Sequence, residues 1–438
     1  MLVMKFGGTS VGNAQRMAHV ADLIVATRRK RQGLVVVVSA MAGVTNALMA
    51  LGRAAAAGDP AAIANGLDSL RIQHLDTAKA LLHGEEEIGP AHEAIAAQID
   101  DLKRVCHSIA TLGEATVRTL DLVAGAGERL SSRLLAAAAR ERGCPAVAVP
   151  ATELIVTDSR FGAAEPDLDA SGPRIRAKLL PLVESGVVPV VTGYIGATPD
   201  GIPTTLGRGG SDFSAAILGA CLGAAEVWIW SDVDGILTGD PNIVPEARTL
   251  AELSYADAAT LAAFGAEVLH PKTVAPLVDR GIPLRLLNTF HPERRGTLIV
   301  GQPTVDGPRP PAIISTKGLL LLSVEGNGSR WSPAIAGRAL SCLAQAGVEV
   351  LMFSQSFSER TLSLLVRVAE REASLRALER EFQDDLRSGA LTRIGPLTQV
   401  GTISIVAAPG GQGARQARNT DRVCSPIGVG VPCLRGRA

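Results

Sequence analysis

Lys5-Phe6-Gly7-Gly8-Thr9-Ser10 comes directly after the apolar start of the chain. Residues 2–6 predict a buried strand, and the two adjacent glycines predict a tight turn with accessible backbone N–H groups. A helix is expected next, capped by Asn13 and ended at Gly33. A second strand is expected at 34–38. This order of strand, turn, helix and strand indicates an α/β domain with an open, mainly parallel sheet sandwiched by helices.

The alternation of strands and helices continues and predicts a first domain over residues 1–301. Four further buried strands are expected, at 146–149, 187–192, 227–230 and 284–287. Helices are expected to begin near residues 127, 211 and 271. Residues 44–109 are rich in Ala and Leu and predict several helices inserted into this pattern. Prolines and glycines in residues 302–311 predict a linker.

A smaller second domain is expected over residues 312–397. Its predicted elements have the order β-α-β-β-α, at 319–324, 332–346, 348–354, 361–368 and 370–387. One more strand would complete a ferredoxin-like βαββαβ unit. Residues 398–438 begin strand-like, lose apolar periodicity after residue 410 and become rich in arginine. Our hypothesis for them is a truncation or a reading-frame slip, which resequencing the coding DNA would test.

The amino-acid composition indicates which kind of partner the protein binds. The 43 basic and 43 acidic residues of this 438-residue chain balance, so no net field attracts nucleic acid or an anionic membrane. Apolar runs are too short to cross a bilayer, and no signal-peptide pattern opens the sequence. Six scattered cysteines without a CxxC pair are typical of reduced thiols. We therefore expect a cytoplasmic protein that binds small molecules.

Two loops follow the first two strands, at one end of a parallel sheet, where ligands bind in such folds. Lys5 with Gly7 and Gly8 can hold a phosphate, although a bare lysine and two glycines more often form an ordinary turn. Ser39 and Thr45 can donate hydrogen bonds to a substrate, although small residues there more often cap a helix. Each loop alone leaves both interpretations open.

The stretch TTLGRGGSD at residues 204–212 favours a ligand site more strongly. The helix that begins near Ser211 and Asp212 offers free N–H groups to an anion. Arg208 carries the planar guanidinium that binds a carboxylate through two hydrogen bonds. A simple helix cap would not explain the glycines, which include Gly209 and Gly210.

Other polar residues carry weaker signals. Glu128 stands near a helix start, where the helix dipole could keep it ionised to hold an ammonium group, but first-turn glutamates are common. Ser231, Asp232 and Asp240 follow a predicted strand and could contact a nucleotide, but Asx-rich turns need no ligand. The pair Lys272-Thr273 puts a cation in a first helical turn, where a phosphate would offset the unfavourable dipole.

Six segments together closely resemble the aspartate kinases of the amino-acid kinase family: KFGGTS, VVSAMAGVTNAL, GERLSSRLL, PTTLGRGGSDFSAAIL, SDVDGILTGDPN and GAEVLHPKT. The resemblance covers residues 2–300, and the following unit resembles that family's regulatory ACT domain. It implies the transfer of the ATP γ-phosphoryl group to the β-carboxylate of L-aspartate, the first step towards lysine, threonine and methionine. It also implies Mg²⁺ held mainly by the nucleotide.

The resemblance assigns roles to residues at matching positions. Catalytic roles fall on Lys5 and Asp212. Aspartate binding falls on Ser39, Thr45, Glu128, Arg208 and Ser211. Nucleotide binding falls on Lys5, Gly7, Gly8, Ser10, Gly209, Gly210, Ser231, Asp232, Asp240, Lys272 and Thr273. Binding of an inhibitory amino acid, such as threonine or lysine, falls on Ser332, Ile335, Ala336, Gly337, Gln355 and Ser356, although these residues could equally be turn formers.

The chain also departs from the family pattern. Leu237 and Asn242 stand where many relatives have Tyr and Arg, which affects the expected adenine stacking and one phosphate contact. Residues 112–114 and the helical insertion resemble the kinase half of fused kinase–homoserine dehydrogenases. The family usually has two ACT units and is expected to form at least a dimer through them, unless the altered C-terminal region prevents it. The alternatives are a kinase for another small amino acid and a catalytically weakened regulator that binds amino acids.

Overall fold

The computed structural model describes the chain except for residues 264–268, 270, 304–311, 328–330 and 407–438. The side chains of residues 263, 271–273, 313–314, 397 and 403–406 also lie outside the description. The chain forms two compact units. The first comprises Met1–Thr238 and Glu246–Arg309, and the second comprises Gly239–Pro245 and Pro310–Ala438.

The first unit contains an eight-stranded sheet with the order β3-β4-β2-β1-β7-β9-β10-β8. Its strands are β1 (Leu2–Phe6), β2 (Leu34–Val38), β3 (Ala146–Val149), β4 (Val188–Thr192), β7 (Glu226–Ser231), β8 (Glu252–Ser254), β9 (Leu284–Asn288) and β10 (Thr297–Val300). Neighbouring strands are parallel except for β9 and β10, which pair antiparallel. The predicted open, mainly parallel sheet is confirmed, and β1, β2, β4 and β7 end along one edge.

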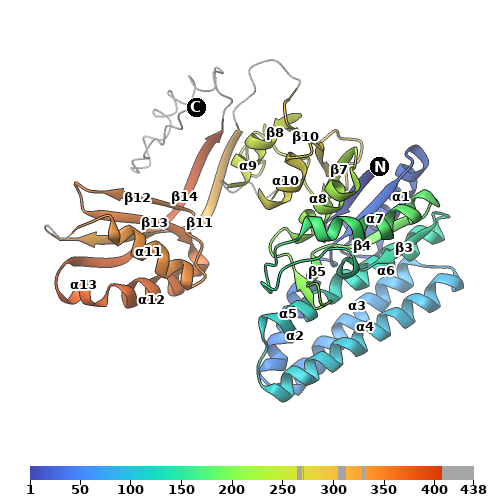
Figure 1. The fold of residues 1–438 in the computed structure, drawn as a ribbon, viewed down its shortest axis with the longest axis horizontal. Coiled ribbons are helices and arrows are strands. Elements are labelled where there is room, and N and C mark those ends of the chain that lie inside the picture. Colours follow the sequence, from blue (N-terminus) through green and yellow to red (C-terminus); the bar gives the residue numbers. More distant parts are fainter. Residues whose placement is uncertain (264–268, 270, 304–311, 328–330, 407–438) are drawn as a thin grey trace. The chain divides into compact units, whose positions relative to one another are not determined.

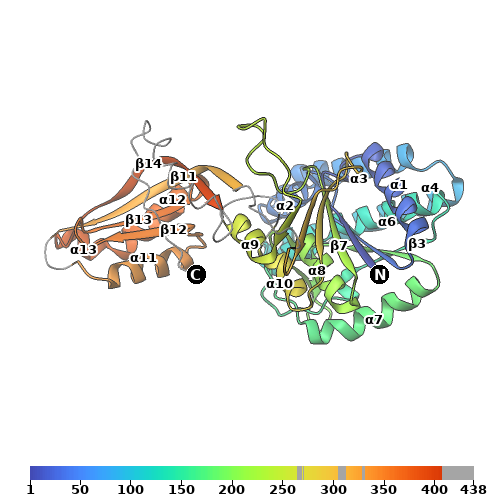
Figure 2. The same cartoon turned by 90° about the horizontal axis from the view of Figure 1, so that it is seen from above.

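Helices cover both faces of this sheet (Figures 1 and 2). On one face lie α1 (Ala14–Lys30) and α6 (Ala126–Glu141), and on the other lie α7 (Leu168–Glu184), α8 (Gly210–Leu222) and α10 (Pro271–Val278); the short α9 (Tyr255–Ala263) contacts α10. The side chain of Asn13 accepts a hydrogen bond from the backbone N–H of Arg16, so the predicted cap of α1 is confirmed. Among the described residues, no helix is both long enough and apolar enough to cross a membrane.

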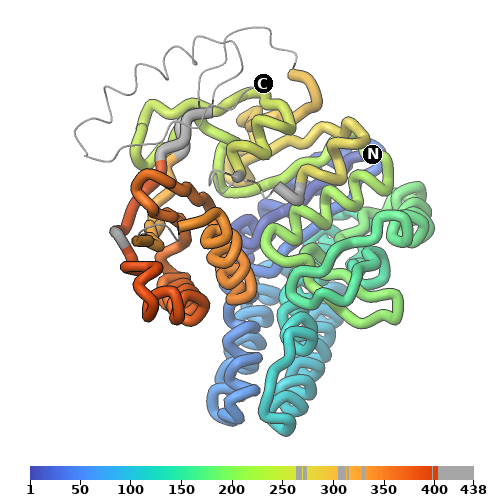
Figure 3. The backbone as a smooth tube through the Cα atoms, turned by 60° about the vertical axis from the view of Figure 1, so that its left-hand side comes forward, coloured from blue at the N-terminus to red at the C-terminus, as the bar shows by residue number. Residues whose placement is uncertain are grey.

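The predicted helical insertion is confirmed. It consists of α2 (Val44–Ala56), α3 (Pro60–Leu81), α4 (Glu85–Leu112) and α5 (Val117–Ala124). Figure 3 shows these helices, in blue and cyan, extending from the sheet. Asp59 caps α3, and Gly113 ends α4 in a left-handed conformation. The chain then returns through α5 to α6, which brings Glu128 back towards the sheet.

The second unit contains an antiparallel sheet of order β12-β13-β11-β14, and helices form part of the connections between its strands. Its elements are β11 (Ala312–Gly326), α11 (Ala334–Gln345), β12 (Met352–Ser356), β13 (Thr361–Arg367), α12 (Arg371–Glu381), α13 (Gln383–Arg387) and β14 (Leu391–Val406). The order β-α-β-β-α is confirmed, and β14 supplies the strand that completes a ferredoxin-like unit.

Several boundaries in the second unit differ from the predicted ones, and the strand expected at 319–324 is observed over Ala312–Gly326. The strand expected at 348–354 begins only at Met352, and the helix expected at 370–387 is divided into α12 and α13. The expected division at 397/398 falls inside β14, because this strand continues along β11 until Val406 pairs with Ala312. Residues 400–406 therefore extend the first ACT-like sheet. The remainder of the C-terminal region, 407–438, lies outside the described residues.

Candidate active site

The glycine turn after β1 is fixed by backbone hydrogen bonds and close packing. The N–H of Gly7 donates to the carbonyl oxygen of Trp230 on β7 at 3.2 Å, and the N–H of Ser10 donates to the Gly7 oxygen at 3.0 Å. A Cβ on Gly8 would lie 2.9 Å from the carbonyl oxygen of Ala40, whereas a Cβ on Gly7 would meet nothing nearer than the Lys5 Nζ at 3.5 Å. Gly8 is thus required by the neighbouring loop, whereas a Cβ at Gly7 would be only in ordinary van der Waals contact with the Lys5 ammonium and the Trp230 oxygen.

Lys5 and Asp212 are brought together by the fold. Lys5 is only 8% exposed, and its ammonium forms an ion pair with the Asp212 carboxylate. Asp212 lies in the first turn of α8, which Gly209 opens in a left-handed conformation with φ of 72°. This backbone geometry favours glycine. The two predicted catalytic side chains therefore meet at the carboxyl end of β1.

Glu128 is a buried carboxyl group beside the loop that follows β2. It is 3% exposed, and its Oε1 accepts a hydrogen bond from the N–H of Ala40 at 3.1 Å. Its Oε2 is buried without a hydrogen-bond partner. Burial raises the pKa of Glu128 to about 7, and the Ala40 N–H only partly offsets this. The sequence analysis expected that the helix dipole could help to keep Glu128 ionised; burial opposes this, because desolvation has the larger effect.

The other predicted aspartate-binding residues lie in the loops around this region. The N–H of Ser39 donates to the oxygen of Phe6 at 3.1 Å, and Thr45 is half-buried in the first turn of α2. A Cβ on Gly193, after β4, would lie 2.7 Å from the side chain of Ser211, so these two segments pack closely. Arg208 is exposed and makes no ion pair within the described part of the chain. Its guanidinium is free to bind an anion.

The predicted nucleotide-binding residues differ from one another in exposure and in hydrogen bonding. Ser231 ends β7, and its carbonyl oxygen accepts from the N–H of Thr289 at 2.8 Å, while Asp232 is exposed. The Ser10 side chain is fully buried, and its hydroxyl lies 2.6 Å from that of Thr289. The hydroxyl of Ser10 is thus engaged inside the protein, and its contact with a phosphate stays a prediction.

For three predicted nucleotide-binding residues the contact with this cluster stays a prediction. Asp240 belongs to the segment 239–245, which groups with the second unit, and its Oδ1 accepts from the N–H of Asn242 at 2.9 Å. Lys272 and Thr273 lie in the backbone of α10, but their side chains lie outside the described residues. Leu237 forms an isolated bridge with Thr249.

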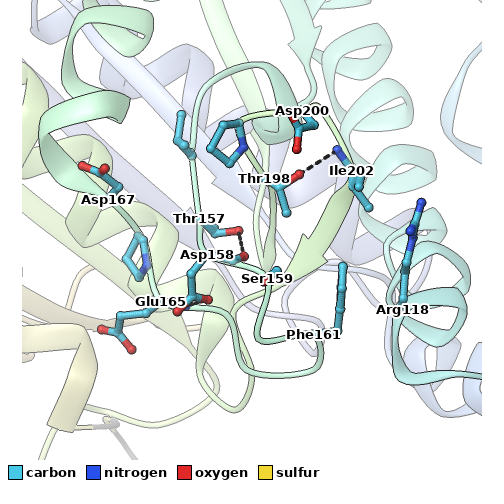
Figure 4. Close-up of a pocket in the computed structure, with 13 residues that line it drawn as sticks. Arg118, Thr157, Asp158, Ser159, Phe161, Glu165, Asp167, Thr198, Asp200 and Ile202 are labelled. Atoms are coloured by element: carbon cyan, nitrogen blue, oxygen red, sulfur yellow. Dashed lines mark hydrogen bonds between the residues drawn. The ribbon is translucent and has the colours of Figure 1, made fainter.

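A cleft lies elsewhere in the first unit. It has a volume of about 620 Å³ and is lined mainly by residues 156–167 and 198–202, with Arg118 of α5 (Figure 4). These segments flank the hairpin of β5 (Ile195–Ala197) and β6 (Pro203–Thr205). The cleft contains none of the predicted site residues, so its size does not identify the reactive centre.

Two residues near the site were missed by the sequence analysis. Asp121 of α5 is 4% exposed and accepts three hydrogen bonds, from Gly162 and from the backbone and side chain of Thr205. The sequence offered one indication of this role, namely a carboxylate among the apolar residues of the helix Val117–Ala124. Tyr194 has a left-handed backbone with φ of 69°, and its N–H donates to the Ser214 hydroxyl at 3.0 Å. No sequence pattern marks it.

In the second unit the two predicted regulatory segments meet. The Nε2 of Gln355 donates to the carbonyl oxygen of Ser332 at 3.4 Å. The side chains of Ile335 and Ala336 are buried in the core, and their backbone N–H groups donate to the carbonyl oxygens of Ser332 and Pro333, each at 3.2 Å, while Gly337 is exposed. The hydroxyl of Ser356 accepts from the N–H of Glu359 at 3.2 Å.

Comparison with known proteins agrees with this arrangement. Residues 1–288 match the model of the amino acid kinase family, and residues 322–382 match that of an ACT domain. The chain belongs to the amino acid kinase family. The second unit of this amino acid kinase is an ACT domain, so both family assignments made from the sequence are confirmed.

This amino acid kinase is similar to named aspartokinases. It is 37% identical over 415 residues to the bifunctional aspartokinase/homoserine dehydrogenase 2 of Arabidopsis thaliana, with 93% of this chain and 44% of that protein covered. It therefore spans under half the length of that relative. Structures of E. coli aspartokinase III, one in complex with aspartate and ADP and one with lysine and aspartate, each match with a TM-score of 0.80 and 28% identity. Each match covers 100% of this chain and 94% of the other.

Proposed function

We propose that the chain is an ATP-dependent aspartate kinase that forms ADP and 4-phospho-L-aspartate. The observation that carries the proposal is the buried Oε2 of Glu128, which lacks a hydrogen-bond partner next to the loops that follow β1 and β2. An α-ammonium group would supply the missing donor and the positive charge. The named relatives support this choice, since E. coli aspartokinase III has been solved with aspartate and ADP.

The proposed reaction needs positioning and charge neutralisation more than covalent chemistry. Arg208 holds the α-carboxylate, Glu128 holds the ammonium, and a β-carboxylate oxygen attacks the γ-phosphorus. The bond from this phosphorus to the β,γ-bridging oxygen breaks, and ADP leaves. Lys5, oriented by Asp212, neutralises the transferred group. No general base is required, because a carboxylate is already ionised at pH 7.

Magnesium supplies further charge neutralisation when it is bound with ATP. Among the described residues, no group of three or more His, Cys, Asp or Glu side chains is arranged to hold a metal ion. The proposal therefore assigns the ion mainly to the nucleotide phosphates. The lack of a side chain at Gly7, beside the Lys5 ammonium, supports the approach of such a phosphate.

The test is ADP release from ATP with aspartate, with glutamate and without an acceptor. We expect turnover with aspartate only. Turnover with glutamate alone would contradict the proposal and would indicate a kinase of the same fold that acts on another small amino acid. A folded protein without turnover on either acid, but with amino-acid binding, would favour the alternative of a weakened regulator.

We further propose that the ACT domain binds an inhibitory amino acid and contributes to a dimer. The contact between Gln355 and Ser332 supports a single ligand site formed by both predicted segments. The E. coli relative has also been solved with lysine. Titration of activity with threonine, lysine and their mixture identifies the inhibitor, and sedimentation measures the oligomeric state.

A further inference from the structure

The carboxylate of Asp121 joins three segments of the first unit. Its Oδ2 accepts from the N–H of Thr205 at 3.0 Å and from the N–H of Gly162 at 2.9 Å, and its Oδ1 accepts from the Thr205 hydroxyl at 2.7 Å. An ionised carboxylate only accepts hydrogen bonds, so all three donors must point at it. One side chain therefore fixes α5, β6 and the loop around Gly162.

Hydrogen bonds and the chain itself connect Asp121 to the two segments that carry Glu128 and Arg208. Its own carbonyl oxygen accepts from the N–H of Gly125 at 3.1 Å, at the junction where α5 passes into α6 and Glu128 follows in the first turn. Thr205 is the last residue of β6, and the turn with Arg208 comes directly after it. The contact of Asp121 with Thr205 thus connects the segment of Glu128 to the segment of Arg208.

No cation compensates this carboxylate within the described part of the chain. It is 4% exposed and forms no ion pair there, so its charge is stabilised by the three donors alone. Removal of this carboxylate is costly, because it leaves the buried N–H of Thr205 and the half-buried N–H of Gly162 without their acceptor.

Thr205, the partner of Asp121, also contacts the segment that follows β4. The hydroxyl of Tyr194 lies beside the Thr205 side chain, and burial raises the pKa of this hydroxyl. The backbone N–H of Tyr194 donates to Ser214 of α8, the helix that carries Asp212. A second path therefore connects Thr205 to the helix of the catalytic ion pair.

We propose that Asp121 is a positioning residue that sets the distance between Glu128 and Arg208 and so matches the site to the length of aspartate. This inference rests on the proposed function. It concerns a residue that touches neither substrate nor nucleotide, and it predicts an effect on aspartate that is separate from any effect on ATP.

The test compares three variants by steady-state kinetics. Asp121→Ala should raise the KM for aspartate by about 10-fold to 100-fold, the range expected for a misplacement near 1 Å, with the KM for ATP nearly unchanged. Asp121→Asn should lie closer to wild type, since its Oδ1 can accept both backbone N–H groups while its Nδ2 faces the Thr205 oxygen. Asp121→Glu keeps the charge but adds a methylene group, so it should resemble the alanine variant.

The matched control is Tyr255→Phe, which removes another buried hydrogen bond of the first unit, from the Tyr255 hydroxyl to the Ile282 oxygen. It should lower thermal stability without changing the KM for aspartate. A folded Asp121→Ala protein with the wild-type KM for aspartate, or an Asp121→Glu variant that behaves as wild type, would overturn the proposal.

Amide hydrogen exchange separates this proposal from the proposed function. In Asp121→Ala, peptides that contain Gly162 and Thr205 should exchange faster, with no change in peptides from α3. If the wild-type protein does not phosphorylate aspartate, the proposed function fails, yet this exchange still shows whether Asp121 holds the segments. Unchanged exchange at both amides would contradict the inference independently of any activity.

Discussion

The ammonium of Lys5, at the carboxyl half of β1, forms an ion pair with the carboxylate of Asp212, in the first turn of α8. Both side chains are largely buried, at 10% and 17% exposure. The pair places a positive charge beside the backbone of Gly7 and prevents the lysine side chain from turning into solvent. The parallel alignment of β1 with β7 and the packing of α8 on β1 create this contact.

Lys5→Ala is expected to lower kcat on the order of 10²–10³-fold, since it removes a preorganised charge from the transferred phosphoryl group. The measurement is ADP release at saturating aspartate and ATP, with circular dichroism to confirm folding. Asp212→Asn should lower kcat less, because the lysine charge remains but loses its orientation. A folded Lys5→Ala protein with substantial kcat would remove Lys5 from the proposed mechanism.

The sequence predicted the sheet for physical reasons, whereas the catalytic roles of Lys5 and Asp212 were implied by the resemblance to the aspartate kinases. Apolar runs such as Leu34–Val38 can only be buried strands in an α/β pattern, and glycines such as Gly209 are needed where the backbone turns left-handed. It did not predict the balance between dipole and burial at Glu128, because desolvation depends on packing from distant segments. Asp121 was missed for the same reason, since its three donors come from residues 162 and 205.

The raised pKa of Glu128 predicts a pH dependence of aspartate binding. The carboxyl group is neutral well below its pKa of about 7 and cannot then hold an ammonium group. In the free enzyme kcat/KM for aspartate should therefore rise with pH through about 7. Bound aspartate favours the ionised carboxylate, so the corresponding step in kcat should lie at lower pH. Rate profiles at varied aspartate concentration measure both.

Glu128→Gln provides the control and a stability test. The folded pKa lies above the ordinary value of 4.5, so this group contributes stability below pH 4.5 that is lost as pH rises through about 7. Without a charge to bury, the variant should be more stable than wild type at pH 8, by at most about 3 kcal/mol, with little difference at pH 4. Its kcat/KM should be low and lack the step near pH 7. If the variant keeps the step near pH 7, the step arises from the titration of a group other than Glu128.

Gln355→Ala is expected to weaken inhibition by whichever of threonine or lysine inhibits the wild type. Gln355 contacts Ser332 across the two predicted regulatory segments, so truncation removes a polar group from their junction. The inhibitor concentration for half activity should rise about fivefold to tenfold, as for a lost hydrogen bond of about 1 kcal/mol, while uninhibited kcat stays unchanged. Ser358→Ala, at an exposed neighbouring turn, is the control. Equal sensitivity of both variants to the inhibitor would separate Gln355 from the ligand site.

Gly7→Ala and Gly8→Ala distinguish a glycine required for a ligand from one required for packing. A Cβ at Gly8 would lie 2.9 Å from the Ala40 oxygen, so Gly8→Ala should destabilise the fold by about 1–3 kcal/mol and lower kcat as well. A Cβ at Gly7 meets no protein atom closer than 3.5 Å, so Gly7→Ala should keep the wild-type melting temperature. Its new methyl group would instead crowd a phosphate beside Lys5 and raise the KM for ATP. Thermal unfolding combined with the KM for ATP decides between the two effects, and a Gly7→Ala enzyme with normal ATP kinetics would place the phosphates away from this turn.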